Sequence, residues 1–410
     1  MFSLKEILLP QIKPALGCTE PAAIALNASY LKEYIKNNKI LSPIKLTINT
    51  NLLKNAMYVP IPNTGKKFGV KLAFLLGFLC GNKKKGLNIF ENVDEKCLKK
   101  AETLINTIDV NIIDGKEIYI KSEAYGYEVI TQKYHDYISF IRTPKKEFKF
   151  SYNTEKIDVT DIENWLKEQN FDTLYDLIEE ERDFGYVKEA VDMNMKLAEI
   201  GLNNDCALNI GKTFYGDDLL SKILSITASA SDARMEGVNF PAMSLVGSGN
   251  HGISAILPVW IYGMEKNFNE KEVLKAVALS MLITLYIKMF IGRLSPICGA
   301  AFASGCGVAG AIAYLQSGER DISKNAISFV IQNINGVICD GAKMACSLKV
   351  FLGAKTGYES AIFALQGKPV YADGILENDI TKSIRNLKII AKSMSGVDGS
   401  IVEIMKNKVI

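Results

Sequence analysis

Cysteines are the side chains whose number and spacing most clearly suggest chemistry in this chain. There are eight among 410 residues, and the N-terminal segment does not read as a signal peptide, because its apolar run is short and flanked by lysines. Without export, cysteines more often serve as reduced thiols or metal ligands than as disulfides. Zinc would favour close Cys-x-x-Cys pairs, which the sequence lacks, whereas an iron–sulfur cluster is usually held by four thiolates. We therefore expect a metal or cluster site.

Three of these thiols are predicted to lie at helix starts. Cys298 follows a Ser-Pro pair, which predicts a helix over 296–315 with this cysteine in its first turn. Cys339 precedes a helical pattern over 341–352, and Cys18 directly precedes another helical pattern. Because helix N-termini lower thiol pKa values and attract anions, these three positions are the strongest candidates for cluster ligands.

The other cysteines are assigned less specifically. Cys346 lies seven residues after Cys339, which on one helix is about 10.5 Å along the axis at 1.5 Å per residue. It is either a fourth ligand, reached by a loosened turn, or a neighbouring thiol. Cys306 lies on a ridge of small residues and is predicted to pack. The remaining three, in apolar or ordinary helical contexts, are also predicted to pack: Cys80, Cys97 and Cys206.

A glycine-rich segment, Gly247-Ser248-Gly249-Asn250-His251-Gly252, is the second candidate site. It matches the dinucleotide-binding fingerprint formally, but the flanking sequence lacks the required β-α-β alternation. Glycines before a helix instead favour a backbone cradle for an anion such as a substrate carboxylate, and a tight turn is the plainer alternative. His251 is either a general base or a helix-cap histidine.

Further polar residues could serve such a site. Asn51 and Lys54 follow a predicted strand over 44–50, where a binding site and a surface loop are about equally expected. Arg234 either binds a carboxylate or forms a structural ion pair with Asp232. A structural role is the first expectation for three further residues. These are Tyr286 as a core tyrosine, Lys288 as a snorkelling lysine and His135 as a structural histidine.

The elements that must position these residues predict an α+β protein. A strand over 44–50, a buried helix over 70–80 and a β-rich insert over about 110–152, with an Asp-Gly turn at 114–115, give an N-terminal α+β region over 1–186 with a small antiparallel sheet. From 187 to 410 the periodicity is mainly helical and includes buried Gly- and Ala-rich helices. We expect this second region to be catalytic and to bind the cluster.

Composition restricts the partners. Hydrophobic residues make up 48% of the chain and charged residues 23%, as in soluble globular proteins. The net charge of +3 gives no reason to expect a nucleic-acid partner. The uncharged stretch from Arg293 to Glu319 is long enough to span a bilayer, but it is rich in Gly, Ala and Ser, which favours a buried helix. We expect a cytoplasmic protein with a small-molecule substrate and no membrane partner; self-association stays open.

Five blocks spread over nearly the whole chain are together specific. They are GCTEPAAIA at 17–25, SASDARM at 229–235, GSGNHGI at 247–253, RLSPICG at 293–299 and ICDGAKMACSLK at 338–349. The chain thereby resembles the L-cysteine desulfidase family, which is related to the iron–sulfur L-serine dehydratases. The resemblance implies an oxygen-sensitive 4Fe–4S cluster held by Cys18, Cys298 and Cys339, with one iron open. In the dehydratases the next cysteine comes after a longer interval, so the role of Cys346 stays open.

The implied reaction splits L-cysteine into hydrogen sulfide, ammonia and pyruvate without pyridoxal phosphate. We hypothesise that iron binds the substrate sulfur, a general base removes the Cα proton, and the glycine cradle holds the carboxylate with help from Asn51 or Arg234. Candidates for the base, in order, are His251, Lys54 and Tyr286. L-serine dehydratase on the same cluster is the nearest alternative. A membrane or scaffolding protein and a pyridoxal phosphate lyase are the others, although no lysine stands out for a Schiff base.

Overall fold

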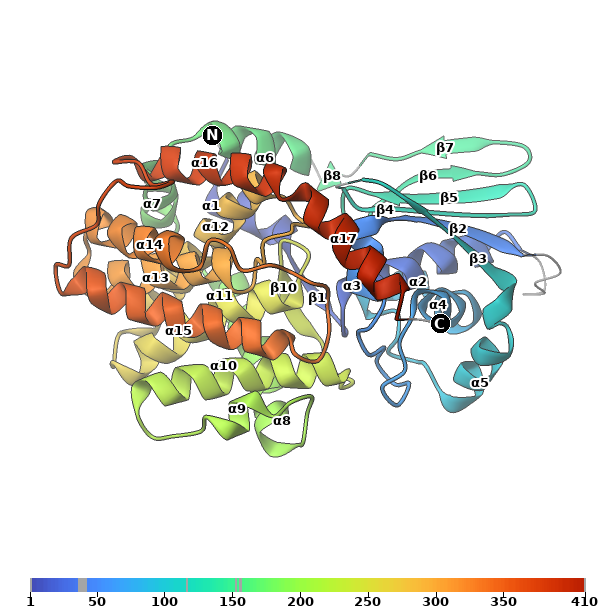
Figure 1. The fold of residues 1–410 in the computed structure, drawn as a ribbon, viewed down its shortest axis with the longest axis horizontal. Coiled ribbons are helices and arrows are strands. Elements are labelled where there is room, and N and C mark those ends of the chain that lie inside the picture. The colour runs from blue at the N-terminus through green and yellow to red at the C-terminus, as the bar shows by residue number, and fades with distance from the viewer. Residues whose placement is uncertain (1, 36–42, 116, 152, 155–156, 409–410) are drawn as a thin grey trace.

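The computed structural model describes residues 2–35, 43–115, 117–151, 153–154 and 157–408. Two lobes lie side by side, one built on a β-sheet and the other almost entirely helical (Figure 1). The predicted α+β class is confirmed, with the helices concentrated in the C-terminal half.

The sheet lobe has six strands in the order β3-β2-β4-β5-β6-β7. Neighbouring strands are antiparallel except β2 and β3, which are parallel. The strands are β2 (Ile44–Asn49), β3 (Ile108–Ile113), β4 (Tyr119–Ala124), β5 (Tyr127–Gln132), β6 (Ile138–Arg142) and β7 (Glu147–Lys149). Its helices are α2 (Thr19–Lys32), α3 (Thr50–Ala56), α4 (Val70–Cys80) and α5 (Glu95–Thr103), with short 3-10 helices η3 (Lys83–Asn88) and η4 (Ile105–Thr107).

The Asp-Gly turn at 114–115 lies between β3 and β4 without pairing them, whereas the small antiparallel sheet predicted for this region is formed by β4 to β7. Strand β2 lies between β3 and β4 and pairs with both, which separates the two strands that the turn would have joined. The predicted insert over 110–152 is likewise part of a larger mixed sheet, because β2 comes from residues far ahead of it in the chain. The predicted strand over 44–50 and the buried helix over 70–80 are confirmed.

The helical lobe is organised around α12 and α13, which pack on each other (Figure 1). Its helices are α1 (Leu4–Leu8), α6 (Val159–Glu168), α7 (Asp172–Glu180), α8 (Gly185–Asn203), α9 (Ile210–Thr213), α10 (Leu219–Glu236), α11 (Gly249–Glu265), α12 (Glu270–Ile291), α13 (Phe302–Ser317), α14 (Arg320–Ile334), α15 (Cys346–Leu365) and α16 (Ile380–Ser393). The small-residue ridge of α13 permits close packing: a Cβ on Gly307 would lie 2.5 Å from the Ser280 carbonyl oxygen of α12.

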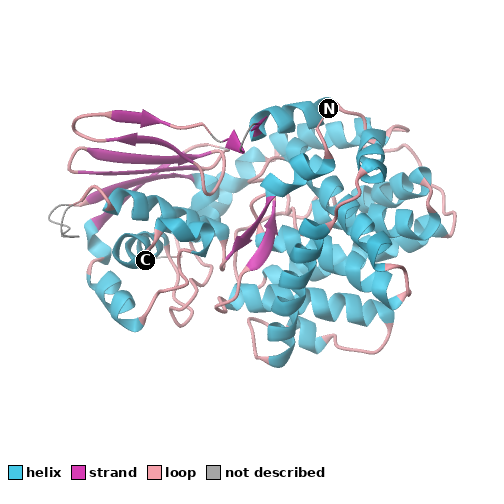
Figure 2. Ribbon diagram, turned by 180° about the vertical axis from the view of Figure 1, so that it is seen from behind, coloured by secondary structure: helices cyan, strands magenta, loops and turns pink. Residues whose placement is uncertain are grey.

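Several segments cross between the lobes. After α1 and the 3-10 helix η1 (Leu9–Gln11), strand β1 (Ile12–Ala15) pairs antiparallel with β10 (Ala242–Leu245) of the helical lobe, and Figure 2 shows this small ribbon between the lobes. At the other end of the chain, α17 (Ser395–Lys406) leaves α16 and packs on α3 of the sheet lobe (Figure 1). Two further short strands, β8 (Asn153–Thr154) and β9 (Ile157–Asp158), pair ahead of α6.

Each of the two larger hydrophobic cores contains residues that lie far apart in the sequence. One core combines the helical half of the chain with residues of α1, α6 and α7, such as Leu4, Ile162 and Leu174. The other core combines residues between Ala15 and Ile141 with Val402 of α17. Both ends of the first 186 residues therefore pack in the helical lobe, which ties the lobes together.

Three helix boundaries differ from their predictions. Helix α13 begins at Phe302, so Cys298 lies in the loop before it, and α15 begins at Cys346, so Cys339 also lies in a loop. Gly341 interrupts the predicted helix over 341–352 because it adopts φ 99°. Helix α10 continues through the polar SASDARM block to Glu236.

Two cysteines predicted to pack separately are joined. Cys80 at the end of α4 and Cys97 in α5 form a disulfide with their Cα atoms 6.4 Å apart, a normal separation for such a bond. The expectation of reduced thiols is therefore wrong for this pair. Cys306 is fully buried in α13, as predicted for a packing residue.

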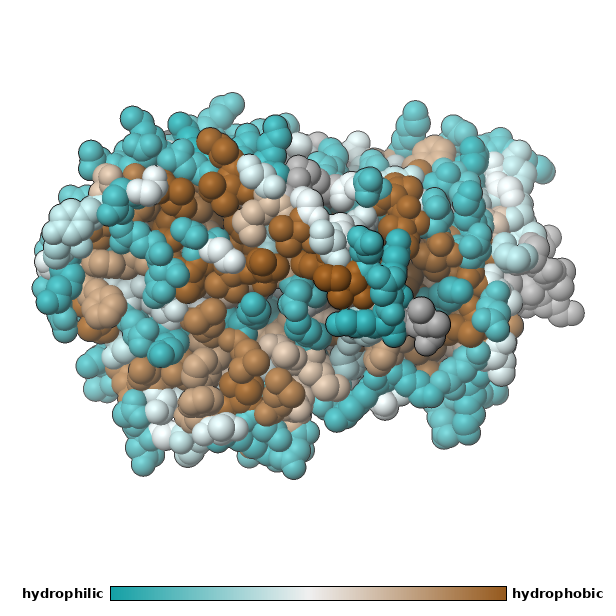
Figure 3. Space-filling model, in the orientation of Figure 1, coloured by the Kyte–Doolittle hydropathy of each residue, from teal (hydrophilic) through white to brown (hydrophobic). Residues whose placement is uncertain are grey.

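One helix among the described residues, α12, is long and apolar enough to cross a membrane, and 83% of its most apolar window is buried inside the protein. Figure 3 shows apolar side chains across the face that α15 forms, and Leu348 and Phe363 of that helix are both exposed. Self-association through such a face stays a prediction.

Candidate functional site

Four cysteines from separate parts of the chain line one small cavity of about 90 Å³ where the lobes meet. Cys18 is the residue before α2, as predicted. Cys298 lies in the loop between α12 and α13, Cys339 in the loop between α14 and α15, and Cys346 at the first position of α15. The three thiols singled out by their sequence contexts, together with Cys346, are therefore brought to one place.

Backbone pairing aligns two of these thiols. The Cys298 amide donates to the Val337 carbonyl at 2.8 Å, and the Cys339 amide donates to the Pro296 carbonyl at 2.7 Å. The two loops thus form a short antiparallel bridge, between Ile297 and Ile338. The Cys298 thiol donates to the Cys339 sulfur, which lowers the pKa of Cys339 to about 6, and the nearby Lys54 and Lys288 ammonium groups act in the same direction.

The other two thiols lie in a more apolar part of the wall, with Val59 and Met235. The Cys18 thiol donates to a carboxylate oxygen of Glu20 at 2.9 Å. Burial raises the pKa of Cys18, and it raises the pKa of Cys346 to about 11. Both are therefore protonated thiols near neutral pH, and metal binding would have to displace their protons.

The four thiols are arranged as ligands of a cluster would be, and not as ligands of a single metal ion. Among the described residues, no three His, Cys, Asp or Glu side chains converge as they would on a single metal ion. A cluster makes a different demand, because each thiolate binds a different iron and the ligand sulfurs surround a space. Four thiols around one cavity fit that demand by donor type and placement. Cys18, Cys298, Cys339 and Cys346 are thus the residues that could hold a cluster.

Side chains with basic nitrogens complete the cavity wall. Arg234 of α10, His251 of α11 and Lys288 of α12 all line it and are 4%, 7% and 2% exposed. Arg234 Nε and His251 Nδ1 are buried without a hydrogen-bond partner among the described residues. Burial lowers the pKa of His251 well below its usual value, so the ring is neutral at pH 7, and it lowers the pKa of Lys288 to about 8.

Two glycines leave the space that the Arg234 and His251 side chains occupy. A Cβ on Gly249 would lie 2.3 Å from Arg234 Nε, and a Cβ on Gly299 would lie 2.3 Å from His251 Nε2. Any larger residue at either position would displace the side chain that lines the cavity. The predicted cradle is placed accordingly: Gly247, Ser248 and Asn250 line the cavity, and α11 begins at Gly249. The strand before this segment, β10, pairs antiparallel with β1, which does not match the parallel β-α-β unit of a dinucleotide site.

Not every predicted residue reaches the cavity. The Tyr286 hydroxyl donates to the Gln169 carbonyl at 2.8 Å, and this tyrosine lies outside the cavity lining, so it is not placed to act as a base. The ammonium of Lys54 contacts Asp398 at 2.5 Å and the Cys339 carbonyl at 2.8 Å, which makes it a positioning group.

Two further predictions change in detail. Asn51 lines a neighbouring, larger cavity instead of the cysteine cavity. Asp232 accepts a hydrogen bond from the Gly211 amide at 3.1 Å, whereas Arg234 points into the cysteine cavity. An ion pair between Asp232 and Arg234 is therefore not formed among the described residues.

Sequence reasoning missed three residues of the wall. His135, predicted to be structural, enters the cavity from the loop after β5, and its Nε2 lies 3.6 Å from the Glu20 carboxylate. Burial alone would raise the pKa of Glu20, but His135 and the Cys18 thiol lower it to about 2. Lys288, predicted to snorkel, is buried instead. Glu20 carried a signal, since it stands two residues after Cys18; His135 had no candidate ligand near it in the sequence.

Comparison with known proteins shows the family of this chain. A "UPF0597 protein" of Nautilia profundicola is 71% identical over the full length of both chains. Proteins of the same name from Desulfatibacillum aliphaticivorans and Caldanaerobacter subterraneus are each 34% identical, with at least 98% of every chain covered. A family model described as "Serine dehydratase alpha chain" matches residues 84–403, a range that contains every cysteine of the cavity except Cys18. The chain therefore belongs to the serine dehydratase alpha chain family.

Proposed function

We propose that this protein is an iron–sulfur-dependent L-cysteine desulfidase that forms hydrogen sulfide, ammonia and pyruvate. The observation that carries the proposal is the meeting of four thiols with buried Arg234, His251 and Lys288 around one cavity. Thiolates are the ligands of iron–sulfur clusters, and buried cations suit the carboxylate of an amino acid. The family, shown by sequence, supports an elimination reaction on a small β-substituted amino acid.

Each side chain has a role in this proposal. A 4Fe–4S cluster held by Cys18, Cys298 and Cys339 would supply an open Lewis-acidic iron that makes the substrate sulfur a better leaving group. Arg234 binds the substrate carboxylate, because its buried Nε has no hydrogen-bond partner among the described residues. The first turn of α11 binds it as well, because backbone N–H groups at a helix N-terminus attract anions. The neutral His251 accepts the Cα proton, and Lys288 adds positive charge beside the carboxylate.

The bonds balance as an elimination. The Cα–H bond breaks first or together with the Cβ–S bond, the proton goes to His251, and the electron pair forms the Cα=Cβ double bond while sulfide leaves. The resulting aminoacrylate takes up water and releases ammonia and pyruvate. Neither an oxidant nor a reductant is consumed, so the chemistry needs no electron-transfer partner.

Anaerobic purification tests the proposal. Iron and acid-labile sulfide are counted on the same preparation that is assayed for sulfide and pyruvate release from L-cysteine. We expect about four irons per chain, as for a 4Fe–4S cluster, and loss of turnover after iron is chelated. Turnover that survives complete iron removal, or a preparation that binds pyridoxal phosphate and needs it, would overturn the proposal.

L-Serine dehydratase is the second candidate, because the matching family model carries that name. The site residues would keep their roles, with a hydroxyl in place of the thiol as leaving group. Paired assays on one anaerobic preparation decide between the two: a higher kcat/KM with L-cysteine supports the desulfidase, and a higher kcat/KM with L-serine supports the dehydratase.

A further inference from the structure

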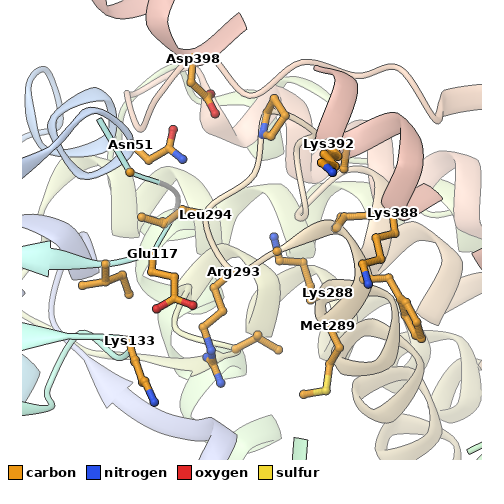
Figure 4. Close-up of a pocket in the computed structure, with 18 of the residues that line it drawn as sticks. Asn51, Glu117, Lys133, Lys288, Met289, Arg293, Leu294, Lys388, Lys392 and Asp398 are labelled. Carbon is orange, nitrogen blue, oxygen red and sulfur yellow. The ribbon is translucent and has the colours of Figure 1, made fainter. Parts of the chain in front are cut away.

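A second, much larger cavity of about 830 Å³ adjoins the cysteine cavity between the lobes (Figure 4). Its volume lies within the range of small-molecule sites in proteins. Its wall takes residues from both lobes, among them Asn51 and Glu117 on the sheet side and Lys388 and Lys392 of α16 on the helical side. No residue of the proposed reaction except Lys288 lies in it, so its role is not explained by the catalytic proposal.

The two cavities share one partition. Four residues line both of them: Val246, Lys288, Arg293 and Leu294. Arg293 is fixed in this wall, because its guanidinium pairs with Glu163, bonds Gln11 at 2.7 Å and lies 4.5 Å from the centre of the Tyr134 ring. Lys288 is buried and faces both spaces, so a ligand that leaves one cavity for the other passes its ammonium group.

The charges of the larger cavity suit an amino-acid zwitterion. Lys133, Lys167, Lys388 and Lys392 line it, and no ion pair is recorded for these four lysines in the described part of the chain. Asp398 and Glu163 are already paired with Lys54 and Arg293. The carboxylates left to meet an ammonium group are Asp114 and Glu117. Figure 4 shows Glu117 on the side of the cavity opposite the α16 lysines. Positive charge is in surplus, which draws a carboxylate inward toward Lys288.

We propose that this interlobe cavity is the chamber through which the amino-acid substrate reaches the cysteine cavity, with its carboxylate guided by Lys388 and Lys392 toward Lys288. The inference rests on the proposed function for the identity of the substrate. The path itself rests on the shared wall and the charges, which are independent of the reaction.

Two glycines of α17 allow the path to be narrowed without a clash. Gly396 and Gly399 line the chamber, and a Cβ added at either would meet no atom within 4 Å. Gly399→Trp should fill part of the chamber, and Gly399→Ala is its matched control, since both replace glycine in a helix. We expect kcat/KM for L-cysteine to fall about tenfold in the Trp variant, the lower end of the effect of one methylene group too many in a binding pocket. The cluster absorption of the Trp variant and the kcat/KM of the Ala variant should stay at their wild-type values.

Charge reversal at Lys388 and Lys392 tests whether these lysines guide the substrate carboxylate. The double variant Lys388→Glu with Lys392→Glu should lower kcat/KM about tenfold at low salt, the lower end of electrostatic steering effects, and less at high salt. Lys382→Glu is the control, because Lys382 is exposed on the same helix but does not line the chamber.

A second measurement separates the path from the reaction. In iron-free protein, alkylation of Cys339, whose lowered pKa makes it the reactive thiolate of the cavity, is followed by mass spectrometry with iodoacetate and with neutral iodoacetamide. Gly399→Trp should slow both reagents, and the double Glu variant should slow iodoacetate selectively. Wild-type alkylation rates in both variants would overturn the chamber, whatever the activity. An inactive wild-type protein whose alkylation follows the expected pattern would instead overturn the proposed function and leave the path standing.

Discussion

At the scale of single residues, the cysteines of the cavity should differ sharply from a cysteine that only packs. Cys298→Ala and Cys339→Ala each remove a proposed cluster ligand, so we predict loss of both the visible cluster absorption and sulfide release. Cys306→Ala is the control: its side chain is fully buried but lies in the core of α13, away from the cysteine cavity. It should keep the cluster and cost about 1 kcal/mol of unfolding free energy, as for a buried methylene-sized group. An anaerobic spectrum of each variant decides.

A second residue-scale prediction concerns Arg234, whose Nε is buried with no hydrogen-bond partner in the part of the chain that the structure describes, and whose side chain faces the cavity. Arg234→Gln removes the charge that binds the carboxylate, and we expect KM to rise about 10- to 100-fold, the range for a lost charged hydrogen bond. Arg234→Lys keeps the charge but not the planar guanidinium group, so its KM should lie between those of the wild type and Arg234→Gln. An unchanged KM in Arg234→Gln with intact cluster absorption would show that the carboxylate binds elsewhere.

Sequence context singled out Cys18, Cys298 and Cys339, which all line the cavity although the last two lie in loops. It did not indicate that His135 also lines the cavity. Cys18 stands directly before a helix, as its context indicated. His135 reaches the cavity only because the loop after β5 meets the N-terminus of α2 in the folded chain, 115 residues from Glu20 in sequence. Contacts of that kind depend on sheet order, which no local pattern encodes. Tyr286 shows the reverse error, since its chain position near the cluster segments does not turn its ring toward them.

At the scale of elements, the C-terminal helix is held by a buried ion pair. Lys54 of α3 and Asp398 of α17 are 1% and 7% exposed and 2.5 Å apart. Asp398→Ala leaves the Lys54 charge buried and uncompensated, so we predict a loss of about 3–5 kcal/mol in unfolding free energy. The double variant Lys54→Met with Asp398→Leu should recover much of this loss. Chemical denaturation measures each variant, and a fully exposed pair, tested by Asp183→Asn, should leave the midpoint unchanged.

Periodicity predicted the existence of most helices, but tertiary contacts set their ends. The helix expected over 341–352 begins only at Cys346, because Gly341 takes a positive φ close to the Lys54 carbonyl, where a Cβ would lie 2.4 Å from that oxygen. The chain thereby keeps Cys339 in an extended loop that pairs with the Cys298 loop. In the same way, the insertion of β2 between β3 and β4 cannot be seen from their alternating patterns, since those patterns fit a hairpin equally well.

At the scale of the whole molecule, the two lobes have separate hydrophobic cores, and α12 runs through the core of the helical lobe. Helix α12 has 22 residues and contains an 18-residue apolar window that by length and composition alone would suit a membrane span, yet 83% of that window is buried inside the protein. An apolar helix buried on all sides in this way is typical of the core of a large globular protein. We therefore predict that the protein dissolves and stays monodisperse without detergent. The measurement is the distribution between soluble and membrane fractions of lysed cells, followed by size-exclusion chromatography in plain buffer; recovery from the membrane fraction only after detergent extraction would mean that α12 faces lipid and that the helical lobe is packed differently.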